Sequence, residues 1–142
     1  MKLLLEPRHD LTPTEIDALE NRLYEHNRAA TCRDDVAGMG FVIHGEEGRF
    51  AGATAGYTWC GIAEIKQMWV AEAFRGRGYG RALLEAMIAE ADRRGVTRIW
   101  VASFEFQAPA MYERSGFVRV AELQDWPEGY VNVILCKSLR RI

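Results

Sequence analysis

The hydrophobic pattern in the first half of the chain predicts one amphipathic helix and several strands. Ile16, Leu19 and Leu23 recur at helical spacing, and Thr12-Pro13-Thr14-Glu15 before them has the composition of a capping box. We expect this helix to pack a narrow apolar stripe against the core. The helical pattern fades over 29–37, where the sequence allows either a loop or a short second helix. Strand-like segments bounded by turn residues are expected at 2–6, 40–44, 50–59 and 62–70. Cys60-Gly61 is short enough for a hairpin, which favours an antiparallel meander.

The second half of the chain alternates helices with strands. Apolar residues at helical spacing predict a second amphipathic helix, and Gly95 stands where it would end; these residues are Leu83, Leu84, Met87, Ile88 and Ala91. A strand is expected over 97–102, and its unbroken run Ile99-Trp100-Val101 is typical of a strand buried on both faces. A short helix over 108–115 and closing strands over 118–123 and 130–135 complete the pattern. The predicted order is therefore β-α-(α)-β-β-β-α-β-α-β-β.

Length, charge and cysteine content narrow the class of protein. The 142 residues, 49% of them hydrophobic, suffice for one core, so we expect a single domain over 1–142. A net charge of −2 argues against a nucleic-acid partner. No apolar run reaches the roughly 18 residues of a membrane span, and Glu6-Pro7-Arg8 interrupts the N-terminal leucines, so we expect no membrane partner, no signal peptide and a cytoplasmic location. Cys32, Cys60 and Cys136 have no metal-ligand spacing, so we expect no metal, a reducing compartment and cysteines that pack as small core hydrophobes.

The sharpest local motif lies between a predicted strand and a predicted helix, and it reads Arg75-Gly76-Arg77-Gly78-Tyr79-Gly80-Arg81. Glycines permit backbone conformations that direct several N–H groups into one concavity, and the positive end of the helix dipole points to the same place. Arginines add charge-assisted contacts, so the motif favours phosphate, and pyrophosphate above all. The alternative is a strand-to-helix turn with solvated arginines. The spacing fits neither Gly-x-Gly-x-x-Gly nor a Gly-Lys-Ser/Thr loop, so dinucleotide and nucleoside-triphosphate binding are not favoured.

Two motifs in their order and setting resemble one known family. Val70, four residues and then Arg75-x-x-Gly78-x-Gly80 resemble the acyl-CoA pyrophosphate motif of the GNAT superfamily of N-acetyltransferases. About thirty residues further on, Met111-Tyr112-Glu113-Arg114-Ser115-Gly116-Phe117 is similar to that family's Tyr-x-x-x-Gly-Phe signature. The order of elements resembles the GNAT fold over essentially the whole chain. The resemblance implies an α+β acyl-CoA N-acyltransferase fold, with a central mixed, mostly antiparallel sheet of about six to seven strands and helices on both faces.

The resemblance also implies how an acyl donor, acetyl-CoA, would be bound. Pantetheine would insert between the strand before the glycine turn and the strand after the long helix, against backbone groups of Met68, Trp69 and Val70. A backbone N–H near the thioester oxygen would stabilise the charge that develops there. The phosphates would be bound by Arg75, Gly76, Arg77, Gly78, Tyr79, Gly80 and Arg81. Gln107 would contact pantetheine or only cap the next helix, since Glu105 stands where many members carry asparagine.

Two residues match catalytic positions of the family. Tyr112 matches the tyrosine that protonates the departing CoA thiolate, and a phenol of pKa near 10 can protonate a thiolate of pKa about 8.5. The alternative for Tyr112 is a tyrosine at the edge of the core. Glu64 lies eleven residues before Arg75, at the offset of the strand glutamate that is the base in histone acetyltransferases of this family. Its alternatives are a solvated carboxylate, paired with Lys66, and a water molecule as the base.

The acceptor is expected to be a small-molecule or peptide amine. In this fold it usually lies between the first-helix region and the loop between the last two strands. Carboxylates and aromatic rings there suit a cationic amine, although solvated charges and core aromatics are the alternative; they are Asp34, Asp35, Glu122, Asp125, Glu128, Tyr57, Trp59, Trp126 and Tyr130. The sequence leaves open a polyamine, an amino acid, an aminoglycoside-like drug, a peptide terminus and a lysine side chain. It also leaves open a homodimer and, as the alternative function, a non-catalytic acyl-CoA-binding or regulatory module.

Overall fold

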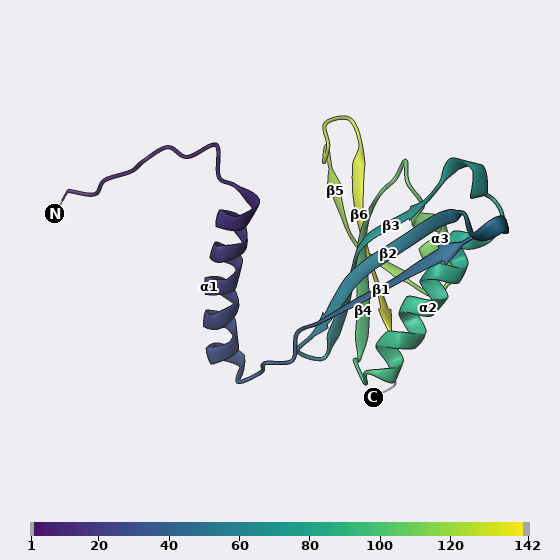
Figure 1. Cartoon of the computed structure of the whole chain (residues 1–142), viewed down its shortest axis with the longest axis horizontal. Helices are drawn as coiled ribbons and strands as arrows, with labels where there is room; N and C mark the ends of the chain where they lie inside the picture. The colour runs from purple at the N-terminus through teal and green to yellow at the C-terminus, as the bar shows by residue number, and fades with distance from the viewer. Residues whose placement is uncertain (1, 141–142) are drawn as a thin grey trace. The chain divides into compact units, whose positions relative to one another are not determined.

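The structure of the protein, a computed structural model, describes residues 2–140 and forms two compact units that divide after Asp34. The first unit contains one helix, α1 (Pro13–Thr31), drawn in purple in Figure 1. Its capping box is confirmed, because the backbone N–H of Glu15 donates to Thr12 Oγ1 at 3.2 Å and the Thr12 N–H donates to the Glu15 carboxylate. The helix ends at Cys32 in the left-handed conformation, and the segment after it is a loop. That the whole chain is a single domain stays a prediction.

Two expectations for the first unit are not met. The predicted strand at 2–6 is wrong: these residues form no regular element, and Leu3, Leu4 and Leu5 are exposed. A strand needs a neighbouring strand to bond its backbone, and none pairs with this segment within residues 2–140. No residue of α1 is buried, because a lone helix has no second element within its unit to cover an apolar stripe.

The second unit is built on a six-stranded sheet in the order β1-β2-β3-β4-β6-β5. All neighbouring strands run antiparallel except β3 and β4, which run parallel, so the mixed, mostly antiparallel α+β fold is confirmed with six strands. The strands are β1 (Ala37–His44), β2 (Phe50–Trp59), β3 (Ile62–Val70), β4 (Arg98–Phe104), β5 (Val118–Gln124) and β6 (Val131–Ser138). The remaining elements are α2 (Tyr79–Arg93), α3 (Pro109–Arg114) and two short 3-10 helices, η1 (Glu46–Gly48) and η2 (Glu72–Phe74).

One core lies between a face of this sheet and the helices α2 and α3. Alternate residues of the central strands point into it, as the two-residue period of a strand requires; they are Ala63, Ile65, Ile99, Val101, Val133 and Leu135. Leu84, Met87 and Ala91 of α2 and Tyr112 of α3 join the same cluster, so both helices cover one face of the sheet. The presence of a helix on the other face stays a prediction.

The predicted hairpin turn formed, whereas the cysteines are less buried than expected. Cys60 and Gly61 form the predicted two-residue hairpin, with φ of 50° and 80° as this kind of turn requires. All three cysteines are free, but Cys32 is exposed and Cys60 and Cys136 are half-buried, so their prediction as core residues is wrong. These sulfurs lie at a helix end, in a turn and on the side of β6 away from the core. Within residues 2–140, no helix is long and apolar enough to cross a membrane.

Candidate functional site

The glycine turn joins the end of β3 to the start of α2. Gly76 and Gly78 have φ of 75° and 87°, the left-handed region that other residues rarely adopt. A Cβ atom at either position would have no heavy atom within 4 Å, so backbone conformation rather than space requires glycine there. At Gly80 a Cβ atom would lie only 3.2 Å from Met111 Sδ of α3, so this glycine serves close packing.

The first turn of α2 presents N–H groups that the helix does not use. Gly78 caps the helix without a side-chain hydrogen bond, and the first helical bond runs from the Ala82 N–H to the Gly78 carbonyl at 3.0 Å. The N–H groups of Tyr79, Gly80 and Arg81 therefore precede the hydrogen-bonded ladder and point out of the helix start. Together with the helix dipole, such groups fit a phosphate, and the cofactor contacts expected at this turn stay a prediction.

The three arginines of the turn have different partners. Arg75 Nε donates to the Val70 carbonyl oxygen at 2.9 Å, which ties the turn to the end of β3. Arg81 forms an ion pair with Glu85 one helical turn later, at 2.9 Å. Arg77 stands over the ring of Phe74, with 5.9 Å between its guanidinium carbon and the ring centre, and it forms no ion pair with another described residue. Among the described residues, neither Arg75 nor Arg77 thus has a carboxylate partner, but the Arg75 guanidinium is fixed to the Val70 carbonyl.

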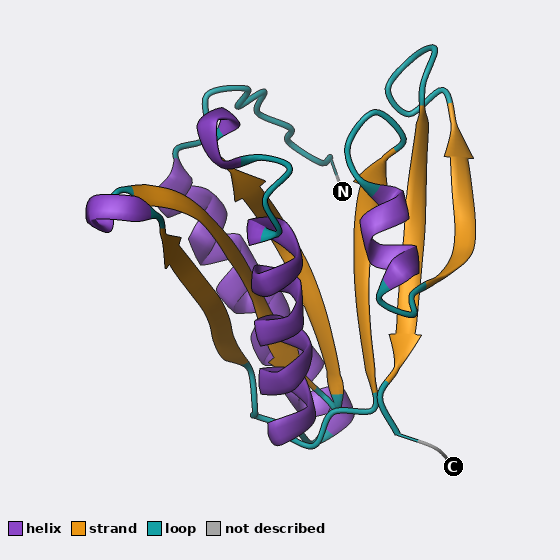
Figure 2. Cartoon of the chain, turned by 90° about the vertical axis from the view of Figure 1, so that its right-hand side faces the viewer, coloured by secondary structure: helices purple, strands orange, loops and turns teal. Residues whose placement is uncertain are grey.

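The sheet opens between β3 and β4 beside this turn. The parallel pairing ends at Ile65 opposite Val101, whereas β3 continues to Val70 and β4 to Phe104. Figure 2 shows the two halves of the sheet diverging from this point. Met68, Trp69 and Val70 pair with β2 alone, so the β4 side of this backbone is left without a strand among the described residues. An exposed strand edge can accept an extended ligand as a further strand, which suits a pantetheine arm.

Tyr112 extends from α3 into the core that lies against one face of the sheet. Its side chain is 4% exposed and its ring meets Phe117 edge-on at 5.5 Å between centres. Burial raises the pKa of Tyr112 to about 12, so the phenol remains protonated at neutral pH. Its hydroxyl donates no hydrogen bond to another described residue, and its role as an acid stays a prediction.

Glu64 lies on the opposite face of the sheet from Tyr112. Its neighbours Ala63 and Ile65 point into the core, so alternation along β3 directs Glu64 to the other side. The Tyr57 hydroxyl donates to Glu64 Oε2 at 2.5 Å, and burial, with the hydrogen bond and charge of this carboxylate, raises the pKa of Tyr57 to about 12. The carboxylate is thus held by a phenol from β2 rather than by Lys66.

Gln107 has a local partner within the turn after β4. Its side-chain oxygen accepts the Phe104 N–H at 2.9 Å, while its own N–H donates to the Phe104 carbonyl at 2.8 Å. These bonds close the turn before α3, and a pantetheine contact from Gln107 stays a prediction. Glu105, at the position of the family's asparagine, lies 3.6 Å from the Arg119 guanidinium.

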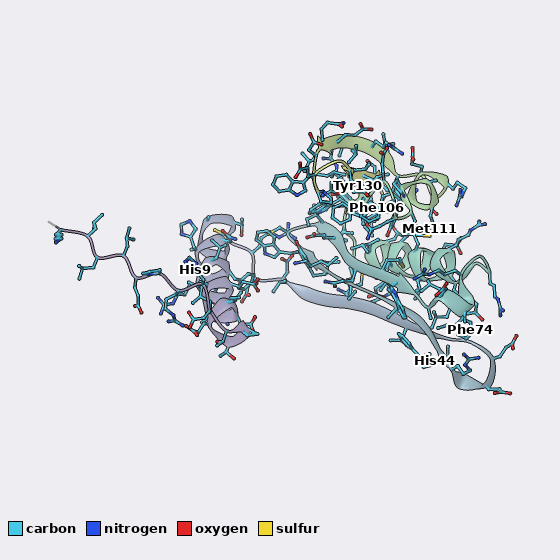
Figure 3. All side chains as sticks on the ribbon, turned by 90° about the horizontal axis from the view of Figure 1, so that it is seen from above. His9, His44, Phe74, Phe106, Met111 and Tyr130 are labelled. Atoms are coloured by element: carbon cyan, nitrogen blue, oxygen red, sulfur yellow. The ribbon has the colours of Figure 1, made fainter. Side chains whose placement is uncertain are left out.

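Several residues near the opening were not singled out from the sequence. Phe104 and Phe106 stack with ring centres 5.2 Å apart, and Phe106 meets Tyr130 edge-on at 5.2 Å (Figure 3). Of the three only Tyr130 was predicted, because the Phe106–Tyr130 contact joins segments far apart in the chain. The Tyr57–Glu64 bond could have been found, since a two-residue hairpin at Cys60-Gly61 fixes these residues opposite each other. Within residues 2–140, no group of three or more His, Cys, Asp or Glu side chains could hold a metal ion.

Comparisons with known proteins agree with this arrangement. The model of the "Acetyltransferase (GNAT) family" matches residues 5–117. A blasticidin-S acetyltransferase of Streptomyces morookaense is 32% identical over 96 residues, which cover 67% of this chain and 71% of the relative. An acetyltransferase of Agrobacterium fabrum is 27% identical over 106 residues, covering 75% and 77% of the two chains. The crystal structure of an acetyltransferase from Bacillus cereus superposes with a TM-score of 0.79 at 26% identity, over 94% of this chain and 98% of that one.

Proposed function

Since the chain belongs to the GNAT acetyltransferase family, we propose that this acyltransferase moves the acetyl group of acetyl-CoA directly to a primary amine. The observation that carries the proposal is the pairing of two features at one end of β3. The N–H groups of Tyr79, Gly80 and Arg81 lie beyond the hydrogen-bonded ladder of α2, and the sheet is open beside Met68–Val70. One feature suits a diphosphate and the other suits an extended arm.

Different residues around the opening bind different parts of the acyl donor. Acetyl-CoA supplies the acetyl group as an activated thioester. The amides of residues 76–81 hold the diphosphate, and the free backbone edge of Met68–Val70 pairs with pantetheine. A backbone N–H on that edge donates to the thioester oxygen and stabilises the charge that grows there.

Tyr112 and Glu64 approach the reaction from the two faces of the sheet. Tyr112, on the core face, donates its proton to the departing thiolate, and its raised pKa keeps that proton in place until the thiolate forms. Glu64, on the other face, takes a proton from the ammonium group of the acceptor, directly or through water, and the neutral amine then attacks the thioester carbonyl. The Tyr57 hydroxyl fixes the orientation of the Glu64 carboxylate. The base for the amine and the acid for the thiol thus act from opposite sides of the opening. The amine adds to the thioester carbonyl, and the tetrahedral intermediate expels the thiolate as the carbonyl re-forms.

The acceptor side combines aromatic rings with carboxylates. Phe106 and Tyr130 form one exposed aromatic surface, and the loop between β5 and β6 adds Trp126 and the acidic residues Asp125 and Glu128. Rings and negative charges together attract a cationic amine. That the acids of the first unit, such as Asp34, complete this site stays a prediction.

A thiol-release assay over a panel of amines tests the proposal. The panel contains a polyamine, free amino acids, an aminoglycoside, a lysine peptide and blasticidin S, the compound for which the relative from Streptomyces morookaense is named. We expect acetyl-CoA to lose its acetyl group to at least one amine, with an equal amount of N-acetyl product by mass spectrometry. Tight binding of acetyl-CoA without thiol release from any amine would instead identify a non-catalytic acyl-CoA-binding module.

A further inference from the structure

An arginine outside the glycine turn lies beside it. Arg49 follows η1 in the connection between β1 and β2, and its guanidinium carbon stands 5.3 Å from the ring centre of Phe74. Phe74 belongs to η2, the short helix that leads into the turn, and its side chain is buried. The hairpin packs closely on this ring at Gly45, where a Cβ atom would come within 2.2 Å of Phe74. Figure 3 shows this end of the hairpin, marked by His44, next to Phe74.

Arg49 and Arg77 gather around the same aromatic ring. The Arg77 guanidinium carbon stands 5.9 Å from the centre of Phe74, so both cations are within cation–π range of one ring. The ring edge of Phe74 also contacts Tyr79, the first residue of α2, with 5.4 Å between ring centres. Both guanidinium groups therefore lie beside Phe74, whose ring also contacts Tyr79, the first residue of α2 with a free backbone N–H.

The charges of these two arginines are not neutralised within the described residues. Arg81 is paired with Glu85, whereas Arg49, Arg75 and Arg77 form no ion pair with a described residue. Of these three, Arg75 already donates to the Val70 carbonyl oxygen, which leaves Arg49 and Arg77 beside Phe74. The acidic residues nearest in sequence, Glu46, Glu47 and Glu72, are exposed and form no ion pair with either arginine. Two guanidinium groups beside one ring, neither of them paired with a carboxylate, favour a doubly charged anion.

We propose that Arg49 and Arg77 bind the ribose phosphate of acetyl-CoA, in addition to the diphosphate held by the turn. This inference rests on the proposed function. Coenzyme A carries three phosphates, of which the ribose phosphate is a monoester with about −1.5 to −2 charges at neutral pH. Because the proposed function assigns the diphosphate to the amides of the first α2 turn, the monoester is the group left for the two arginines. Arg49 thereby makes the β1–β2 hairpin part of the donor site, which the glycine motif alone does not indicate.

Calorimetric titration with coenzyme A and with 3′-dephospho-coenzyme A tests the inference, because the two ligands differ only in the ribose phosphate. We expect Arg49→Gln and Arg77→Gln each to raise the Kd for coenzyme A about tenfold, the loss of one charge-assisted contact. Arg49→Gln, which lies outside the glycine turn, should bind 3′-dephospho-coenzyme A as the unaltered protein does. Arg98→Gln, an exposed arginine at the far end of β4, is the matched control and should change neither Kd.

The outcomes separate this inference from the proposed function. An unchanged Kd for coenzyme A in Arg49→Gln overturns the inference, and so does an equal loss of affinity for both ligands, which would place Arg49 at the diphosphate or in the fold. Either result leaves the proposed function standing if the unaltered protein binds coenzyme A. Failure of the unaltered protein to bind either ligand would overturn the proposed function as well. Partial recovery of affinity in Arg49→Lys would support a role through charge.

Discussion

Replacing Gly78 by alanine separates the backbone shape of the turn from its packing. Gly78 has φ of 87°, and a Cβ atom there would meet no heavy atom within 4 Å. The substitution therefore adds no clash, and its whole effect comes from forcing an L-residue into the left-handed region. That conformation costs about 1–2 kcal/mol for a residue other than glycine.

The chain can respond in two ways, and each has a measurable size. If the introduced alanine keeps the left-handed conformation, the protein loses that energy from its stability, and Tm falls by roughly 4 °C for each kcal/mol at this chain length. If the turn relaxes instead, the N–H groups of Tyr79 and Gly80 move away from the phosphate. A hydrogen bond to a charged group contributes about 1.5–3 kcal/mol, so losing one raises the Kd for acetyl-CoA roughly tenfold to a hundredfold. We expect relaxation, because the turn is exposed.

The assay compares Gly78→Ala with Gly129→Ala by calorimetric titration of acetyl-CoA and by thermal unfolding. Gly129 is a matched control, since its φ is 82° and it also has nothing within 4 Å of a Cβ position, but it lies in the β5–β6 loop. We expect the Kd for acetyl-CoA to rise in Gly78→Ala and to stay unchanged in Gly129→Ala. Equal affinity for acetyl-CoA in the two variants would refute the idea that the left-handed backbone at 78 forms the phosphate site.

Three further changes test the chemistry and the electrostatics. Tyr112→Phe removes only the donor hydroxyl, so kcat should fall about a hundredfold with an unchanged Kd for acetyl-CoA; an unchanged kcat would exclude the acid role. Glu64→Gln should lower kcat/KM and remove its rise with pH, and a variant that keeps the pH profile would assign deprotonation to water. The guanidinium groups of Arg93 and Arg94 lower the pKa of Glu90 to about 2, below its unfolded value of 4.5, so the Tm advantage of the unaltered protein over Glu90→Gln should persist above pH 4.5 and shrink as the pH falls toward 2. A constant Tm difference from pH 6 to pH 3 would contradict this pairing.

Local signals predicted the elements whose causes are local. The capping box at Thr12 and Glu15 and the hairpin at Cys60-Gly61 depend on a few neighbouring residues, and both formed as expected. The segment 2–6 has the composition of a strand but no neighbouring strand to pair with among the described residues, so composition alone misled. Strand 130–135 was placed correctly but extends to Ser138, because pairing with β4 continues there.

The sequence predicts only those residues of the candidate site that belong to a contiguous motif. Left-handed conformations in the turn were predictable because the residues there are glycines. Tyr112 could be singled out because Gly116-Phe117 follows it in the motif. The position of Arg49 beside Phe74 depends on how a hairpin folds onto a distant turn, and no spacing in the sequence records that contact. The assignment of Glu64 and Tyr112 to opposite faces likewise needed the register of the sheet.

The central claim is that unpaired amide hydrogens at the start of α2 bind the diphosphate of acetyl-CoA. Titration of the ¹⁵N-labelled protein with acetyl-CoA, followed through its amide signals, tests this most directly. We predict downfield amide-proton shifts for Tyr79, Gly80 and Arg81 that saturate together with binding, and slowed exchange of these protons with water. Binding that saturates while these three signals stay in place would contradict the claim.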